Sequence, residues 1–199
     1  MKLLHVTDIH FNLEHMSWIR NQVGIADLVC ITGDFIDSRY ECEVPIEDQV
    51  NQIKNWLSGF KVPVLVCSGN HDEIGDELDS SWLKGVGGVF TDGSITEIKG
   101  VTYGCAGFGT TDFSHFTKCQ VLLHHEPPAG LKVAKQSGRD FGSRHLTTAI
   151  KDGTLSLDWL LCGHVHAPLK HTSKFRNCCI SNPGSNLDSS IPNHHWINI

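Results

Sequence analysis

Three short and nearly continuous apolar runs organise the first third of the chain. Each run is followed at once by a glycine or an aspartate: residues 3–7, 27–32 and 62–68. Strands of this kind are typical of a parallel sheet covered on both faces, because every side chain then meets another protein layer. The runs therefore predict a buried sheet with helices packed against it.

The segment after Pro45 has a different period. Its apolar side chains recur at spacings of four, three and four residues: Ile46, Val50, Ile53 and Leu57. This stripe predicts an amphipathic helix, and the acidic residues in its first turn suit the positive end of the helix dipole. A second helix is expected from a cap at Ser143 to about residue 151, ending near Gly153.

The remainder of the chain is rich in predicted strands. They cover residues 95–98, 101–105, 119–123, 155–162, 169–174 and 177–181. Lys99-Gly100 separates the first two strands as a hairpin-like turn, and the last two strands form another hairpin. Parallel strands followed by hairpins predict an α/β fold in which a sandwich of two sheets is flanked by helices. The sequence shows no repeat or linker-like segment, which predicts a single domain over residues 1–199.

Composition restricts the functions that fit this pattern. The chain has 199 residues, 40% of them apolar, and a formal net charge of −6 without a basic run. Broad attraction to nucleic acid or to an anionic membrane is therefore not favoured. No apolar run approaches the roughly 18 residues of a membrane-spanning helix, and Thr7, Asp8 and His10 follow the start too early for a signal peptide. The eight scattered cysteines indicate free thiols, so a cytoplasmic protein is expected.

The 13 histidines are the most informative part of the composition, because several of them follow predicted strands. Five strands end in residues that can bind a metal ion: Asp8 and His10; Asp34; Asn70 and His71; His124; His164 and His166. Loops beyond the carboxyl ends of strands are where α/β proteins assemble their sites. Oxygen and imidazole ligands together suit Mn²⁺, Fe, Zn²⁺ or Co²⁺. So many ligands exceed the needs of one tetrahedral ion and suffice for two ions that share a carboxylate.

These motifs follow one another in a characteristic order. The order is Asp8-x-His10, Gly33-Asp34-x-x-Asp37, Gly69-Asn70-His71-Asp72, His124 and Gly163-His164-x-His166, with residues 182–185 as a further match. From residue 8 to residue 166 the chain thereby resembles the calcineurin-like metallophosphoesterases. The resemblance implies a four-layer αββα fold. It also implies phosphoester hydrolysis by in-line attack of a hydroxide that bridges two metal ions.

The resemblance further implies a role for each motif residue. One metal ion would be held by Asp8, His10, Asp34 and His166, and the second by Asp34, Asn70, His124 and His164. Asp34 would bridge the two ions. Asn70 and His71 would bind the substrate phosphate, and His71 would protonate the leaving oxygen. Asp37 would orient His71 and raise its basicity, as carboxylate partners of imidazole do.

Two of these assignments have local competitors. His125 directly follows His124, and the family favours the first histidine after the strand as the ligand, which leaves His125 and Glu126 for the rim of the site. Asp37 opens a loop, where an acidic residue is ordinary. Asp72 is expected to be structural, as a cap for the segment that follows it.

The resemblance leaves the substrate open. The expected cofactors are two divalent metal ions, with Mn²⁺ favoured over Fe, Zn²⁺, Co²⁺ or Ni²⁺. A small phosphodiester or phosphomonoester is the favoured substrate because the chain is acidic, and no membrane partner is expected. One alternative is a metal-dependent nuclease acting on DNA or RNA, and a less favoured one is a non-enzymatic scaffold of the same fold. Specificity is expected to depend on residues 38–45, 108–118 and 127–143.

Overall fold

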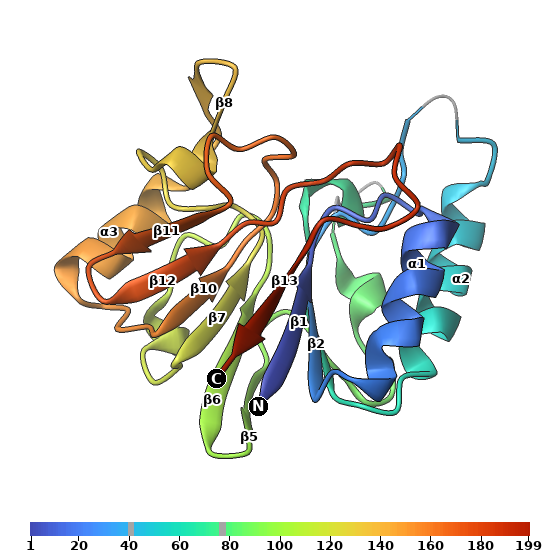
Figure 1. Ribbon diagram of the computed structural model, residues 1–199, viewed down its shortest axis with the longest axis horizontal. Helices are drawn as coiled ribbons and strands as arrows, with labels where there is room; N and C mark the ends of the chain where they lie inside the picture. Colours follow the sequence, from blue (N-terminus) through green and yellow to red (C-terminus); the bar gives the residue numbers. More distant parts are fainter. Residues whose placement is uncertain (40–41, 76–78) are drawn as a thin grey trace.

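A computed structural model of the chain describes residues 1–39, 42–75 and 79–199. Two β-sheets pack face to face, and helices cover their outer faces (Figure 1). α1 (Leu13–Asn21) and α2 (Ile46–Ser58) lie against the first sheet, and α3 (Arg144–Asp152) lies against the second. The predicted α/β sandwich of two sheets flanked by helices is therefore confirmed.

The first sheet has the strand order β13-β1-β2-β3-β4. Four of its strands are parallel: β1 (Lys2–Val6), β2 (Leu28–Thr32), β3 (Val64–Cys67) and β4 (Val89–Phe90). The three early apolar runs form the first three of these strands, as predicted. β13 (His194–Asn198) lies antiparallel to β1 and was not predicted, because its residues HHWIN carry no clear apolar period.

The second sheet has the order β11-β12-β10-β7-β6-β5. Its strands are β5 (Ile95–Ile98), β6 (Val101–Ala106), β7 (Val121–His124), β10 (Trp159–Leu161), β11 (Thr172–Phe175) and β12 (Cys178–Ser181). The four inner strands are parallel, and the two edge strands pair antiparallel with their neighbours. Lys99 and Gly100 have φ values of 52° and 81°, the left-handed geometry of a tight hairpin turn.

Shorter elements complete the chain. β8 (Lys135–Gln136) and β9 (Arg139–Asp140) form a separate hairpin. The 3₁₀ helices are η1 (Gln22–Gly24), η2 (Asn70–Asp72), η3 (Ser81–Leu83), η4 (Ser114–Phe116) and η5 (Lys132–Ala134). α3 begins and ends as predicted, since the Ser143 side chain accepts a hydrogen bond from the Leu146 N–H and Gly153 is left-handed. Within the described ranges, no helix has the length and apolarity needed to cross a membrane.

The core has three apolar layers because side chains alternate on each strand. Along β2, Leu28 and Cys30 belong to the cluster between the two sheets, whereas Val29 and Ile31 pack in the cluster that includes α1 and α2. Full burial of such side chains stabilises the fold by about 1.5–3 kcal/mol each. The same alternation decides which polar side chains can enter the space between the sheets.

Candidate metal centre

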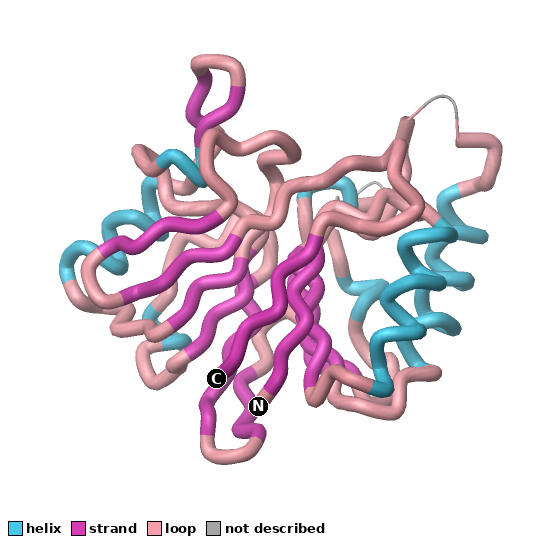
Figure 2. The backbone as a smooth tube through the Cα atoms, in the orientation of Figure 1, coloured by secondary structure: helices cyan, strands magenta, loops and turns pink. Residues whose placement is uncertain are grey.

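The strands that carry the sequence motifs end at one edge of the sandwich, where loops from both sheets gather (Figure 2). Asp8 N–H donates to the Gly33 carbonyl at 3.1 Å, which joins the loops after β1 and β2. Gly163 N–H donates to the His125 carbonyl at 2.8 Å, which joins the loops after β10 and β7. The His164 N–H donates to Asp8 Oδ2 at 3.1 Å and so links the two sheets.

One group of side chains at this edge has the composition that the sequence predicted. Asp8, His10, Asp34 and His166 each present one ligand atom, and these atoms all lie within 4.8 Å of one another. His10 Nε2 is 3.2 Å from His166 Nε2 and 3.8 Å from Asp34 Oδ2. The two carboxylates and His10 are buried, whereas the His166 side chain is 43% exposed. This group can hold one metal ion that remains reachable from solvent.

A second group shares Asp34 with the first. Ligand atoms of Asp34, His125 and His164 also lie within 4.8 Å of one another. His125 Nε2 is 3.3 Å from Asp34 Oδ2, and His164 Nδ1 is 2.9 Å from Asn70 Oδ1. Asn70, a predicted ligand, therefore stands beside this group. Two groups that meet at one carboxylate are the arrangement of a dinuclear centre.

The histidine that joins the second group is His125, where the sequence predicted His124. His124 shares its face of the sheet with Leu122, and its ring packs edge-on against Phe113 at a centroid distance of 5.3 Å. His125 falls on the opposite face, and its Nδ1–H donates to the Thr32 carbonyl of the first sheet, 2.7 Å away. The assignment of His124 is corrected on this ground, because strand alternation turns it away from the space between the sheets.

The backbone at this edge is bent sharply. Asp8, His10, Asp34 and His164 have φ values of 50°, 43°, 54° and 67°, a region that non-glycine residues seldom occupy. Gly33 has a φ of 83°, and a Cβ there would overlap His125 Nδ1 and the Gly69 backbone. A Cβ on Gly69 would overlap the Asp34 carboxylate. The two glycines thus let the bridging carboxylate sit between two loops.

The electrostatics of the centre favour a cation. Asp8 Oδ1 and His125 Nε2 are fully buried and face ion-pair partners at 3.3 Å, but neither makes a hydrogen bond to a described residue. Burial raises the pKa of Asp34, yet His125 and the other nearby donors outweigh it and hold that pKa well below the usual range. Burial lowers the pKa of His125, but the Asp34 carboxylate raises it to about 10. These unsatisfied ligand atoms fit a divalent metal ion.

Two further histidines are prepared for metal binding by their surroundings. Burial is the main cause that lowers the pKa of His10 and of His164, against the opposing charges of Asp34 and Asp8. A low pKa keeps imidazole neutral at physiological pH, and the neutral ring is the form that binds metal. Desolvation at this edge therefore favours the ligand form of both side chains.

His71 lies beside the first group and is held by a residue that the sequence did not identify. The ring nitrogen Nδ1 of His71 is 2.7 Å from Ser38 Oγ, and the backbone N–H of His71 donates to Asp34 Oδ1 at 2.9 Å. The His71 ring is 4.9 Å from the His10 ring, centroid to centroid. The predicted partner, Asp37, instead binds the guanidinium and N–H of Arg39, whose hydrogen bonds hold the pKa of Asp37 below its usual value. The expected contact of Asp37 with His71 is therefore corrected to a contact of Ser38.

Other residues fix the loops without facing the centre. Asp72 accepts hydrogen bonds from the N–H groups of Phe35, Ile36 and Gly69, so Asp72 is structural as predicted, but the backbone that it holds precedes it, whereas a cap for the following segment was expected. Burial, and then the charge of Asp34, raise the pKa of Asp72 to about 7. Thr7 Oγ1 donates to Asp8 Oδ2 at 2.6 Å.

The chain around residues 182–185 supports the centre from the second sheet. The Asn182 side-chain amide donates to the Gly163 carbonyl at 3.0 Å, and Ser185 Oγ donates to the Asp8 carbonyl at 2.9 Å. Sequence reasoning noticed this segment as a motif but assigned no role to its side chains. The polar residues of this segment directly follow β12, and this position after a strand could have indicated that they support the centre.

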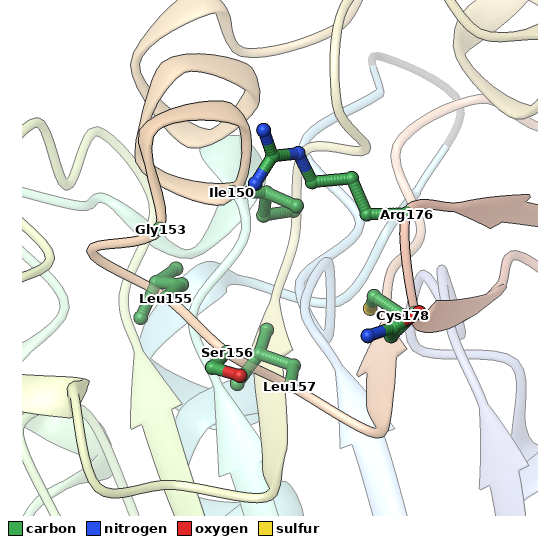
Figure 3. A pocket seen from close by; sticks show the side chains of 8 residues that line it. Ile150, Gly153, Leu155, Ser156, Leu157, Arg176 and Cys178 are labelled. Carbon is green, nitrogen blue, oxygen red and sulfur yellow. The ribbon is translucent and has the colours of Figure 1, made fainter.

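Residues from the predicted specificity segments surround the centre. The Phe108 and Phe141 rings each lie 6.3 Å from the His164 ring, centroid to centroid. A pocket of about 690 Å³ includes Asn70 and His71 in its wall and so adjoins the centre. Another pocket, of about 270 Å³, lies at the end of α3, where Arg176 extends toward Ile150 (Figure 3). The described lining of this second pocket includes no residue of the candidate centre.

Two mixed sheets between helices, with two histidine–carboxylate groups at the ends of their strands, are features of a metal-dependent phosphoesterase. The sequence profile of the family described as calcineurin-like phosphoesterase matches residues 1–168. The chain belongs to the calcineurin-like phosphoesterase family, a family of metal-dependent hydrolases. A comparison with curated proteins found no match.

Several solved structures share this fold. The protein TT1561 of Thermus thermophilus has a TM-score of 0.64 at 12% identity, over 98% of this chain and 97% of that chain. An archaeal phosphodiesterase has a TM-score of 0.52 at 16% identity, over 99% and 100% of the respective chains. Purple acid phosphatase from yellow lupin (Lupinus luteus) has a TM-score of 0.58 at 14% identity, over 100% of this chain and 46% of that one. At such identities the likeness shows the fold alone.

Proposed function

We propose that this protein hydrolyses phosphoester bonds of small molecules with the help of two divalent metal ions, for which Mn²⁺ is the favoured identity. The observation that supports the proposal is the pair of ligand groups that share Asp34. Asp8, His10, Asp34 and His166 would hold one ion, and Asp34, Asn70, His125 and His164 would hold the other. Both groups combine oxygen with imidazole nitrogen, which suits Mn²⁺, Fe, Zn²⁺, Co²⁺ or Ni²⁺ better than Mg²⁺ or Ca²⁺.

The bound ions would supply Lewis-acid stabilisation of the phosphate and lower the pKa of a water molecule. The chain's own residues would orient and protonate the substrate. Asn70 would direct its amide to the phosphate, since its oxygen already faces His164. Ser38 Oγ is hydrogen-bonded to Nδ1 of His71, so the other ring nitrogen of His71 would be available to the substrate. His71 would bind a phosphate oxygen or protonate the leaving oxygen from that position.

The charge of the chain supports a small substrate over a nucleic acid. A formal net charge of −6 repels a polyanion, and nucleic-acid binding normally depends on contacts of lysine and arginine with many phosphates. A small phosphoester needs only one phosphate at the centre. We therefore place a phosphodiester or phosphomonoester of a small molecule first, ahead of DNA or RNA.

We also propose that residues 1–199 fold as one domain in a reducing compartment such as the cytoplasm. The first and last strands pair with each other, and the Met1 ammonium donates to the Ile199 carbonyl at 2.6 Å. All eight cysteines are free, and most of them are buried. Free buried thiols are typical of proteins kept under reducing conditions.

Metal removal tests the proposal most directly. The purified protein would be stripped with a chelator, reloaded with Mn²⁺, Fe²⁺, Zn²⁺, Co²⁺ or Ni²⁺, and measured for bound metal and for hydrolysis of bis(p-nitrophenyl) phosphate, p-nitrophenyl phosphate and short single-stranded DNA. The expected result is two ions per chain and hydrolysis of a nitrophenyl ester that disappears on stripping and returns with metal. Cleavage of DNA alone would favour the nuclease, and a metal-loaded protein inactive on every substrate would favour a scaffold.

A further inference from the structure

The pocket of about 690 Å³ beside the candidate centre differs from the centre in chemistry. Its described lining includes Asn70 and His71 of the candidate centre together with residues from the start of α2 and from the segment after η2. A phosphate held by Asn70 and His71 would therefore have this space next to one of its ester oxygens. The volume lies within the range of about 300–1,000 Å³ that is usual for small-molecule sites.

The rest of the described lining includes apolar and acidic side chains. Ile46 and Ile74 supply apolar surface, and Glu47 and Glu73 supply carboxylates. Ile46 is the first residue of α2 and is 39% exposed, which leaves its side chain available for contact. Among the described residues that line the pocket there is no lysine or arginine.

The helix that begins at this pocket does not provide an anion site. α2 starts at Ile46, and its first turn carries Glu47 and Asp48, which already complement the positive end of the helix dipole. A second phosphate or a carboxylate in the pocket would meet the carboxylates of Glu47 and Glu73, and no lysine or arginine of the described lining would balance it. An apolar group would instead bury surface against the two isoleucines without that repulsion.

We propose that this pocket binds the organic group of the phosphoester and selects apolar groups that carry no negative charge. The proposal rests on the proposed hydrolysis at the adjoining centre, and it narrows the substrate class to esters of one phosphate with an apolar alcohol. Nucleic acids, dinucleotides and nucleoside polyphosphates would place a further anion in the pocket, so the acidic wall disfavours them.

The test compares p-nitrophenyl phosphodiesters that share one leaving group and differ in the second group. The second group is phenyl or a carboxylated phenyl. The expected kcat/KM value is at least about tenfold higher for the phenyl ester than for the carboxylated ester. Equal values for the two esters would overturn the pocket proposal and leave the hydrolytic function intact.

Variants separate the two contributions of the wall. Ile46→Ser should raise KM for the phenyl ester roughly 3- to 10-fold with kcat nearly unchanged, because binding surface is lost equally in the ground and transition states. The matched control is Ile95→Ser, which changes an isoleucine of the same 39% exposure in β5 and should leave KM unchanged. The double variant Glu47→Gln/Glu73→Gln should raise kcat/KM for the carboxylated ester about tenfold.

A binding measurement keeps the inference testable if no ester is turned over. Calorimetric titration of the metal-loaded protein with diphenyl phosphate and with its carboxylated analogue should show tighter binding of diphenyl phosphate, and Ile46→Ser should weaken it by the same factor as KM. Hydrolysis without this preference would contradict the pocket proposal alone. Binding with this preference but without hydrolysis would contradict the proposed function alone. Equal binding of both compounds without turnover would contradict both.

Discussion

The two sheets contribute differently to the candidate metal centre. Loops after the first sheet's strands provide both carboxylates, Asp8 and Asp34, whereas loops after the second sheet's strands provide only imidazoles, His125, His164 and His166. The negative charge that would balance two cations therefore comes from one side of the sandwich. The other side completes the ligand sets and contributes the exposed His166, where an ion can be reached from solvent.

The first-sheet loops are fixed to one another by hydrogen bonds. His10 N–H donates to the Asp34 carbonyl at 2.9 Å, and the next residue pair repeats the contact, since Phe11 N–H donates to the Phe35 carbonyl at 2.8 Å. Asp72 adds hydrogen bonds to the N–H groups of Phe35 and Ile36. A carboxylate shared by two ions needs such a fixed position, because a displacement of either loop would change both ligand sets at once. The comparison predicts that changes on the first sheet have the larger effects.

The largest effect is expected for Asp34→Asn. The amide keeps the size of the carboxylate but removes its charge, so both ions should lose affinity by more than about 100-fold, the upper range for supporting residues. Hydrolysis should be abolished with them. Metal content after dialysis and the rate on bis(p-nitrophenyl) phosphate measure both losses.

Asp188→Asn provides the control for Asp34→Asn, because Asp188 is exposed and distant in sequence from every candidate ligand. It should keep two ions and the full rate. Retention of one tightly bound ion in Asp34→Asn would show that Asp34 serves one ion only, and the comparison of the two sheets would then lose its central point.

A second pair of variants tests the contribution of the second sheet. His125→Ala should remove one ligand and weaken the ion of the second group, with a fall in rate of at least about 10-fold. His124→Ala removes a ring packed on Phe113 and should mainly reduce the free energy of unfolding, by roughly 2 kcal/mol or more, as large-to-small changes in a core do. Metal content and thermal unfolding of the two variants distinguish these results. Loss of metal in His124→Ala with normal binding in His125→Ala would restore the assignment made from the sequence.

The error at residues 124 and 125 shows what the sequence could and could not predict. The order of motifs located every loop of the centre, and the family resemblance implied the grouping of Asp8, His10, Asp34 and His166, whose ligand atoms the structure brings together. For two adjacent histidines, however, the assignment depends on which strand face is turned to the other sheet. Leu123 packs between the sheets and Leu122 on the outer face, so alternation along β7 contained the answer.

The fold was predictable to a similar depth. Strands that are buried on both faces appear in the sequence as continuous apolar runs, and α2, which is buried along one stripe, appears as apolar residues at helical spacing. Both patterns are strong enough to predict the elements. α1, with nine residues, and the edge strand β13 were missed because their short, mixed sequences carry little periodicity. The contact of Ser38 with His71 was missed for another reason. It joins loops 33 positions apart in sequence and depends on loop geometry that spacing does not encode.

A smaller effect is expected for the residues that would act on the substrate without holding metal. His71→Ala should retain two ions and lower kcat by about 10²–10⁴-fold, the usual value of acid–base assistance. Ser38→Ala should lower kcat by only about 3- to 10-fold, because it removes one hydrogen bond that orients the ring. The pH dependence of kcat provides the second readout. Because Ser38→Ala removes the hydrogen-bond partner of His71 Nδ1, it should shift the part of the pH profile of kcat that reports the protonation of His71. Loss of bound metal in His71→Ala would instead make His71 a ligand.

The smallest effect is expected for Asp37→Asn, although Asp37 lies in the same first-sheet loop as Asp34. Its carboxylate binds Arg39, whose side chain is 55% exposed, and an ion pair of that kind contributes only about 0–1 kcal/mol. The rate should therefore change less than about threefold, with two ions bound and the pH profile of kcat unmoved. Kinetics over a range of pH, compared with Ser38→Ala, check this expectation. A loss of about 100-fold with a shifted pH profile would mean that Asp37 orients His71 during turnover. The loop after β2 would then carry two essential carboxylates, and the contrast between the two sheets would become stronger.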